Sequence, residues 1–197
     1  VVRAIWELSR ILKREPQLAL KLDKDLPLAA GLGGGSSDAA AALWGLLELW
    51  DITPQAVSGL DKLMLDLGAD VPACFACQPV LATGIGEKLL PVEGLPELPI
   101  VLVNPNKACP TGEVFNRFYK KFASPVTFPE SLAPENLTEF LSKTENMLTE
   151  PAIELVPDIA EMLEVLAEQA GCTLARLSGS GATCFGLFKD SESAALA

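Results

Sequence analysis

The sequence contains no histidine, and its 15 basic residues are outnumbered by 26 acidic ones. Without histidine, the chain lacks both the commonest general base near neutral pH and the commonest metal ligand. The formal net charge of -11 argues against nucleic acid or an anionic membrane as the main partner, because both attract basic surfaces. A small anionic ligand is compatible with this charge if backbone N–H groups bind it.

Long apolar runs are also missing. No uncharged stretch is apolar enough to span a bilayer, and no segment resembles a signal peptide. The 5 cysteines are scattered and odd in number, which does not fit a disulfide framework and favours a reducing cytoplasm. Cys74 and Cys77 form a C-x2-C motif, but no second pair or histidine accompanies them at zinc-ligand spacing. We therefore predict that these two cysteines are small core residues.

Hydrophobic periodicity predicts a mixture of helices and strands. Helices are expected at residues 1–13, 37–50, 53–68, 111–122, 145–156 and 157–170, and another begins at Asp190. Strands are expected at 17–23, in a hairpin of 79–83 and 88–92, at 99–105 as a buried strand, and on both sides of a glycine turn within 173–188. Residues 125–134 are predicted to form a loop. The proline-rich segment 91–99 predicts a boundary between a domain of residues 1–92 and one of residues 93–197.

A glycine-rich segment, LPLAAGLGGGSSDAAAAL, occupies residues 26–43 between a predicted strand and a predicted helix. A dinucleotide fingerprint would need a third glycine where Ser36 stands, and a Walker loop would need a lysine, which residues 26–61 do not contain. What remains is a loop whose N–H groups, from Gly31 to Ser37, surround phosphate oxygens at the positive end of the next helix. Ser36 and Ser37 would cap that helix or ligate a phosphate-bound magnesium. The alternative is close packing of helix and strand without a ligand.

Three motifs together resemble those of the GHMP kinase superfamily. The pattern P-x3-G-L-G-G-G-S-S-D-A at Pro27–Ala39 resembles its phosphate motif, and G-A-D-V-P at Gly68–Pro72 resembles its catalytic motif. L-S-G-S-G-A at Leu177–Ala182 resembles its third glycine motif. The motifs stand in the family order, and the resemblance covers essentially the whole chain. The triple glycine followed by S-S-D-A looks most like the branch that acts on 4-diphosphocytidyl-2-C-methyl-D-erythritol.

The resemblance implies an α+β fold, with a two-layer N-terminal domain like domain 2 of ribosomal protein S5 and a ferredoxin-like C-terminal domain. It implies a kinase of the non-mevalonate isoprenoid pathway that transfers the terminal phosphate of ATP, with Mg2+, to the 2-hydroxyl of this cytidine diphosphate-linked methylerythritol. Two alternatives stay open: another GHMP kinase, acting on homoserine or mevalonate, and a non-catalytic nucleotide-binding fragment. The oligomeric state is left open.

The resemblance also assigns roles to individual residues. Asp70 is the catalytic residue, because an aspartate beside the acceptor hydroxyl orients it and takes its proton. Thr111 and Phe115 match the threonine and phenylalanine that line the cytidine pocket, and Phe115 would stack on the base. No metal ligand is assigned. The ATP-binding residues implied by the phosphate motif are Pro27, Leu28, Ala29, Ala30, Gly31, Leu32, Gly33, Gly34, Gly35, Ser36 and Ser37.

In the family, the catalytic aspartate works with a lysine on an early strand. No such segment stands ahead of the predicted helix 1–13, so we expect the N-terminal strands of the domain to be absent, which puts the activity of this chain alone in question. Lys21 and Lys24 lie just before the glycine-rich segment and are candidate substitutes. A position at a solvated strand end favours a structural role for both.

Overall fold

The computed structural model describes residues 1–27, 29–119, 122–123, 126–129 and 132–197. The chain divides into two compact units, the first made of residues 1–25 and 33–93 and the second of residues 26–32 and 94–197. The glycine-rich segment is therefore shared, because its first half belongs to the second unit and its second half to the first. The domain division at residues 92 and 93 stays a prediction.

The first unit consists mainly of helices and one β-hairpin. Its elements are α1 (Val2–Leu12), α2 (Gly34–Leu49), the 3-10 helix η1 (Pro54–Ala56), α3 (Leu60–Leu67), α4 (Val71–Ala76), β1 (Val80–Thr83) and β2 (Lys88–Pro91). β1 and β2 pair in an antiparallel manner, with Thr83 opposite Lys88. The first helix and the hairpin are thus confirmed. α2 begins three residues before the predicted start, because Gly34 and Gly35 already belong to its first turn.

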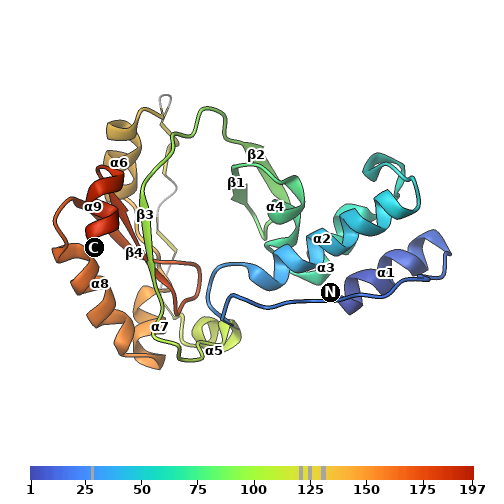
Figure 1. The fold of residues 1–197 in the computed structure, drawn as a ribbon, viewed down its shortest axis with the longest axis horizontal. Helices are drawn as coiled ribbons and strands as arrows, with labels where there is room; N and C mark the ends of the chain where they lie inside the picture. The colour runs from blue at the N-terminus through green and yellow to red at the C-terminus, as the bar shows by residue number, and fades with distance from the viewer. Residues whose placement is uncertain (28, 120–121, 124–125, 130–131) are drawn as a thin grey trace. The chain divides into compact units, whose positions relative to one another are not determined.

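The core of the first unit lies between its helices, and α1 and α2 run side by side (Figure 1). Leu43, Leu46, Leu47 and Trp50 recur at helical spacing along α2 and its C-terminal end, and the three leucines are at most 2% exposed. The fourth, Trp50, is half-buried against the same core. Each buried leucine stabilises the folded state by about 2 kcal/mol. This stripe therefore sets which face of α2 is buried.

The strand predicted at residues 17–23 is wrong. Leu18, Leu20 and Leu22 are 39%, 48% and 48% exposed. Within the described residues, no strand pairs with this segment. An extended segment becomes a strand only when a neighbour satisfies its backbone hydrogen bonds, and the alternating leucines alone do not supply that neighbour.

The helix predicted at residues 53–68 is interrupted. Val57 adopts an extended conformation, and Gly59, at φ +83°, starts α3 separately. The helix α4 was not predicted, because six residues are too few for a helical period to stand out. Just beyond it, Cys77 is exposed, so it is not the core residue that we predicted, while Cys74 is partly buried.

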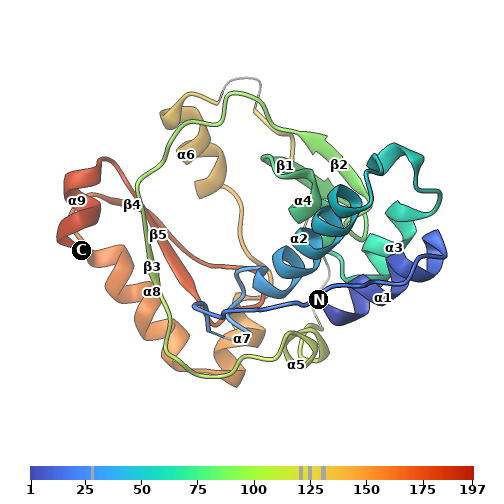
Figure 2. The same cartoon turned by 45° about the vertical axis from the view of Figure 1, so that its right-hand side comes forward.

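The second unit contains a three-stranded antiparallel sheet in the order β3-β5-β4. Its strands are β3 (Ile100–Val103), β4 (Cys172–Leu177) and β5 (Cys184–Phe188), and its helices are α5 (Thr111–Asn116), α6 (Pro134–Ser142), α7 (Thr149–Leu155), α8 (Asp158–Glu168) and α9 (Ser191–Leu196). α8 packs against β4 and β5 (Figure 2). α9 begins where predicted, with the Asp190 carboxylate accepting the Ser193 N–H at 2.7 Å. The α+β class is confirmed.

Three predictions for the second unit need correction. The helix predicted at 111–122 ends at Asn116, because no core covers the apolar residues beyond it: Phe122 is 85% exposed. Residues 120–121 of that prediction lie outside the described residues, as do 125 and 130–131 of the predicted loop. α6 begins at the end of that loop and was not predicted. β3 is an edge strand rather than a buried one, with Ile100 and Leu102 each 51% exposed.

Cys184 provides a pH test of the core of the second unit, in which it is 0% exposed. Burial raises the pKa of its thiol from 9.0 to about 11. Between these values the unfolded chain loses the proton while the folded chain keeps it, so the free energy of unfolding falls as pH rises, by roughly 2–3 kcal/mol in total. Cys184→Ala should therefore make the decline from pH 9 to pH 11 shallower in urea titrations followed by circular dichroism. The exposed Cys77→Ala should keep the wild-type slope, and a Cys184→Ala slope equal to wild type would contradict the prediction.

None of the described helices combines the length and apolar character needed to cross a bilayer.

Candidate functional site

The first half of the glycine-rich segment is bonded to the turn between β4 and β5, within the second unit. The Thr183 N–H donates to the Ala30 carbonyl oxygen at 3.1 Å, and the Ser178 hydroxyl donates to the Gly31 carbonyl oxygen at 2.8 Å. Gly31 has φ +73°, and a Cβ there would lie 2.3 Å from the Ser178 carbonyl oxygen. Only glycine fits this contact. The third glycine motif therefore lies against the glycine-rich segment.

The other predicted ATP-binding residues of this half differ in exposure. Ala30 is buried and Leu32 is partly buried, whereas Pro27 and Ala29 are exposed. Leu28 lies outside the described residues.

The second half of the segment forms the start of α2, in the first unit. Gly33, at φ +67°, precedes the helix, and the first helical bond runs from the Ser37 N–H to the Gly33 carbonyl oxygen at 2.8 Å. The N–H groups of Gly34, Gly35 and Ser36 have no acceptor among the described residues. These three donors lie at the positive end of a 16-residue helix with no acidic residue in its first turn, which suits an anion. The prediction that the Ser37 N–H also faces the ligand is wrong, because that group is already bonded.

The two serines do not cap α2, which has no side-chain cap bond. Both lie inside its first turn, Ser36 partly buried and Ser37 exposed. Neither hydroxyl has a hydrogen-bond partner in the part of the chain that the structure describes. Both hydroxyls are therefore available to a ligand.

Asp70 is the residue immediately before α4, and it is exposed. Its side chain makes no cap bond to the helix, whereas its carbonyl oxygen accepts the Cys74 N–H at 3.0 Å. The next residue, Val71, is only 1% exposed and anchors the segment in the core. Negative charge on Asp70 also contributes, after burial, to raising the pKa of the Cys74 thiol. The carboxylate is thus free to act on a ligand while its backbone is fixed.

Contacts within the first unit place the Asp70 segment beside the start of α2. A Cβ on Gly68 would lie 3.7 Å from Ser36 Oγ. A Cβ on Gly86, in the hairpin turn, would lie 2.2 Å from the Ala69 carbonyl oxygen, so the hairpin turn also packs closely against the residue before Asp70. Trp44 of α2 stacks on Phe75 of α4 with ring centroids 4.5 Å apart. The predicted catalytic carboxylate and the three free N–H donors therefore belong to one packed assembly.

The two lysines considered as partners of Asp70 bind other carboxylates. Lys24 Nζ lies 2.6 Å from Asp38 Oδ2, and Lys21 Nζ lies 3.0 Å from Asp23 Oδ2. Among the described residues, neither pairs with Asp70. Lys24 also holds the carboxylate of Asp38, which follows the first turn of α2.

The predicted substrate residues both lie on α5, in the second unit. The Thr111 hydroxyl lies 2.8 Å from the Ser180 hydroxyl in the third glycine motif. Phe115 is 55% exposed, so it is not a core aromatic and its ring is available to stack on a base. The sequence did not indicate that Thr111 contacts the glycine turn, because the two hydroxyls are separated by 69 residues along the chain.

Sequence reasoning also missed Asn146. Its side-chain amide donates to the carbonyl oxygens of Leu177, at 3.0 Å, and Gly179, at 2.7 Å. The helix predicted at residues 145–156 is present as α7, which begins only at Thr149, but the partners of the Asn146 amide were not predicted.

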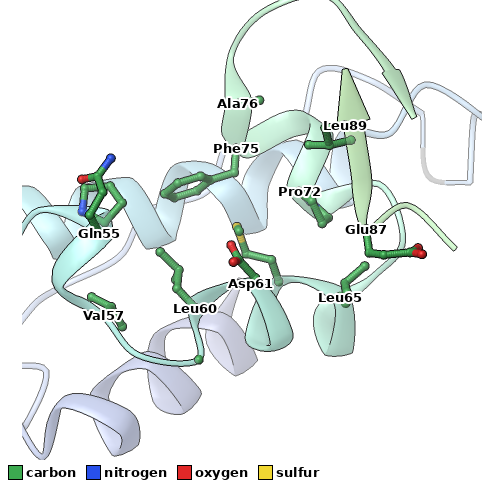
Figure 3. Close-up of a pocket in the computed structure, with 13 residues that line it drawn as sticks. Gln55, Val57, Leu60, Asp61, Leu65, Pro72, Phe75, Ala76, Glu87 and Leu89 are labelled. Carbon is green, nitrogen blue, oxygen red and sulfur yellow. The ribbon is translucent and has the colours of Figure 1, made fainter. Parts of the chain in front are cut away.

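A pocket of about 550 Å³ opens in the first unit between η1, α3, α4 and β2 (Figure 3). Its lining is mostly apolar, including Leu60, Pro72 and Phe75, and its charged members are Asp61 and Glu87. Both charged side chains of this lining are carboxylates, which repel a polyphosphate. The start of α2 is therefore the better candidate for an anion.

Comparison with known proteins identifies relatives of this chain. The profile of the GHMP kinases N terminal domain matches residues 1–78, and that of the GHMP kinases C terminal matches residues 131–197. A 4-diphosphocytidyl-2-C-methyl-D-erythritol kinase of Agrobacterium fabrum is 46% identical over 179 residues, which cover 89% of this chain and 58% of that protein. The kinase of the same name from Rhodospirillum rubrum is 46% identical over 196 residues, which cover 98% of this chain and 64% of that protein. The chain thus spans about three fifths of the length of these relatives.

A solved structure agrees with the sequence comparison. The crystal structure of a 4-(cytidine 5'-diphospho)-2C-methyl-D-erythritol kinase matches with a TM-score of 0.74 and 31% sequence identity, covering 97% of this chain and 69% of that chain. The matching profiles, relatives and fold agree with the three motifs, and the chain belongs to the GHMP kinase family.

Proposed function

We propose that this chain carries the nucleotide-binding and catalytic parts of a kinase that transfers the terminal phosphate of ATP to the 2-hydroxyl of 4-diphosphocytidyl-2-C-methyl-D-erythritol. The observation that carries the proposal is the packing of the Gly68–Asp70 segment against Ser36, beside three unbonded N–H groups. Relatives that bear the name of this kinase, at 46% identity, support the substrate.

The backbone at the start of α2 binds phosphate oxygens. The N–H groups of Gly34, Gly35 and Ser36 donate to them, and the helix dipole adds to the attraction. Glycine at positions 33–35 keeps Cβ atoms away from the phosphates, since a Cβ at Gly33 or Gly35 would project into open space. The phosphates are thus bound without a lysine.

Asp70 acts on the acceptor. Its carboxylate accepts a hydrogen bond from the 2-hydroxyl and orients that oxygen toward the terminal phosphorus. It takes the proton of the hydroxyl as the new bond to phosphorus forms and the bond from this phosphorus to the bridging oxygen of ATP breaks, which releases ADP. Thr111 and Phe115 hold the cytidine end of the acceptor, by a hydrogen bond and by stacking.

Magnesium is the metal that the family implies. Within the described residues, no group of three or more His, Cys, Asp or Glu side chains is placed to hold a metal ion. The unbonded hydroxyls of Ser36 and Ser37 fit a Mg2+ ion that is bound mainly by phosphates and water. When bound, Mg2+ neutralises charge on the transferred phosphate.

The five free cysteines support a cytoplasmic setting.

Substrate turnover tests the proposal, in a protein that includes the N-terminal segment of the relatives. With ATP, kcat/KM should be at least about a hundredfold higher for 4-diphosphocytidyl-2-C-methyl-D-erythritol than for homoserine or mevalonate. The two smaller alcohols lack a cytidine, so they cannot make the stacking and hydrogen-bonding contacts of the cytidine pocket. A preference for homoserine or mevalonate would overturn the substrate. Calorimetry that detects no binding of ATP to the 197-residue chain would overturn the nucleotide role.

A further inference from the structure

Asn146 connects the start of α7 to the glycine turn between β4 and β5. Its Nδ2 donates to the carbonyl oxygens of Leu177 and Gly179, at 3.0 and 2.7 Å, and its Oδ1 accepts the Leu148 N–H at 3.0 Å. All three partners are backbone groups of the second unit. Because both donors and one acceptor of the amide are used, its orientation is determined.

The segment that carries Asn146 is itself held in place. The guanidinium of Arg176, on β4, donates to the Thr144 hydroxyl at 2.9 Å and to the carbonyl oxygens of Leu141 and Thr144, each at 2.6 Å. The glycine turn has few bonds of its own, from the Gly181 N–H to the Ser178 carbonyl oxygen and from the Ser178 N–H to the Thr183 carbonyl oxygen, both at 2.9 Å. Asn146 is therefore held on its own side of the contact and restrains the carbonyl groups of Leu177 and Gly179 in the turn.

Fixing the Gly179 carbonyl also fixes the next N–H. The peptide between Gly179 and Ser180 is trans, so its C=O and N–H point in opposite directions. With the carbonyl held by Asn146, the Ser180 N–H is directed away from Asn146. Ser180 is only 7% exposed, yet this N–H has no acceptor among the described residues. A buried N–H without a protein partner is rare in folded proteins, and it is satisfied by water or by an atom of a ligand.

The position of the turn indicates the kind of ligand. The neighbouring Ser178 donates to the Gly31 carbonyl oxygen, so the turn contacts the glycine-rich segment directly. The Ser180 hydroxyl lies 2.8 Å from the Thr111 hydroxyl, on the side of the predicted substrate residues. We propose that Asn146 is a positioning residue that aims the Ser180 N–H at a phosphate oxygen. The proposal rests on the proposed function, which supplies two sources of phosphate: ATP and the diphosphate of the acceptor.

Asn146→Asp separates this role from the bond that Asn146 accepts from the Leu148 N–H. The aspartate keeps an oxygen to accept the Leu148 N–H, but it loses both donors and brings a carboxylate toward two carbonyl oxygens. Asn104→Asp is the matched control. Asn104 also accepts a backbone N–H, from Asn106 at 2.8 Å, and donates to the Thr183 hydroxyl at 2.8 Å. That hydroxyl can turn and donate to an aspartate instead, whereas a carbonyl oxygen cannot.

The experiment compares binding of ATP, CDP, adenosine and cytidine by calorimetry, together with deuterium exchange of residues 178–181 in the ligand-free protein. For Asn146→Asp we expect faster exchange and at least about tenfold weaker binding of ATP, of CDP or of both, with adenosine and cytidine within about twofold of wild type. Asn104→Asp should match wild type throughout. If Asn146→Asp does not fold, Asn146→Ser, which keeps an acceptor but cannot reach both carbonyls, takes its place.

The outcomes separate the two proposals. Weaker binding of ATP assigns the Ser180 N–H to the nucleotide, and weaker binding of CDP assigns it to the acceptor diphosphate. Unchanged binding of both, or an equal loss for the nucleosides that lack phosphate, overturns the role of Asn146. If wild type binds neither ATP nor CDP, the proposed function itself fails.

Discussion

Asp70→Asn should lower kcat by about a hundredfold to ten-thousandfold and leave the Kd for ATP nearly unchanged, because the amide cannot take the proton of the acceptor hydroxyl. The variant keeps the size of the side chain. Its cost to folding should be small, since the Asp70 side chain is exposed and makes no cap bond to α4. The measurement is steady-state turnover of 4-diphosphocytidyl-2-C-methyl-D-erythritol, in a protein that includes the N-terminal segment of the relatives.

Asp61→Asn is the matched control for this substitution. Asp61 is also an exposed aspartate near the start of a helix of the same unit, but it lines the apolar pocket of Figure 3 rather than the start of α2. Its kcat should stay within about twofold of wild type, because surface substitutions of this kind have small effects. Equal turnover by Asp70→Asn and wild type would refute the catalytic role of Asp70.

Gly31→Ala should lower the free energy of unfolding of the second unit by about 2–5 kcal/mol. Two costs add: a left-handed backbone costs an alanine about 1–2 kcal/mol, and the overlap of its Cβ with backbone atoms costs about 1–3 kcal/mol more. The overlap is severe, because the Cβ would lie 2.3 Å from the Ser178 carbonyl oxygen and 2.7 Å from that of Gly181. Urea titration followed by circular dichroism measures the change. Affinity for ATP should fall as well, because the glycine-rich segment separates from the turn.

Two neighbouring glycines separate these costs. Gly33 has φ +67° but open space at its Cβ position, so Gly33→Ala should cost only about 1 kcal/mol. Gly35 has neither a positive φ nor a close neighbour and lies within α2, so Gly35→Ala should leave stability unchanged or raise it by up to about 1 kcal/mol. If Gly31→Ala were no more destabilising than Gly33→Ala, the contact between the segment and the turn would not hold in solution.

Local patterns predicted much of the fold. The leucine stripe of α2, the hairpin with its glycine turn, and the strands around the third glycine motif follow from periods of 3.6 or 2 residues and from turn residues. One segment has the hydrophobic period of a strand but does not form one, because it has no neighbouring strand among the described residues. Leu18, Leu20 and Leu22 alternate as in a strand, yet no described strand pairs with them.

Helices and strands with a clear hydrophobic period, and the three glycine motifs, could be recognised in the amino-acid sequence alone. Both kinds of feature depend on residues that lie close together along the chain. Three features of the site became visible only in the folded chain. They are the unbonded N–H groups at the start of α2, the position of Ser36 beside the Asp70 segment, and the bond from Asn146 to the Gly179 carbonyl oxygen. The last of these contacts joins residues 33 positions apart, and the bond of Ser178 to Gly31 spans 147. No local period encodes such pairs, because they form only when the packed core brings distant segments together.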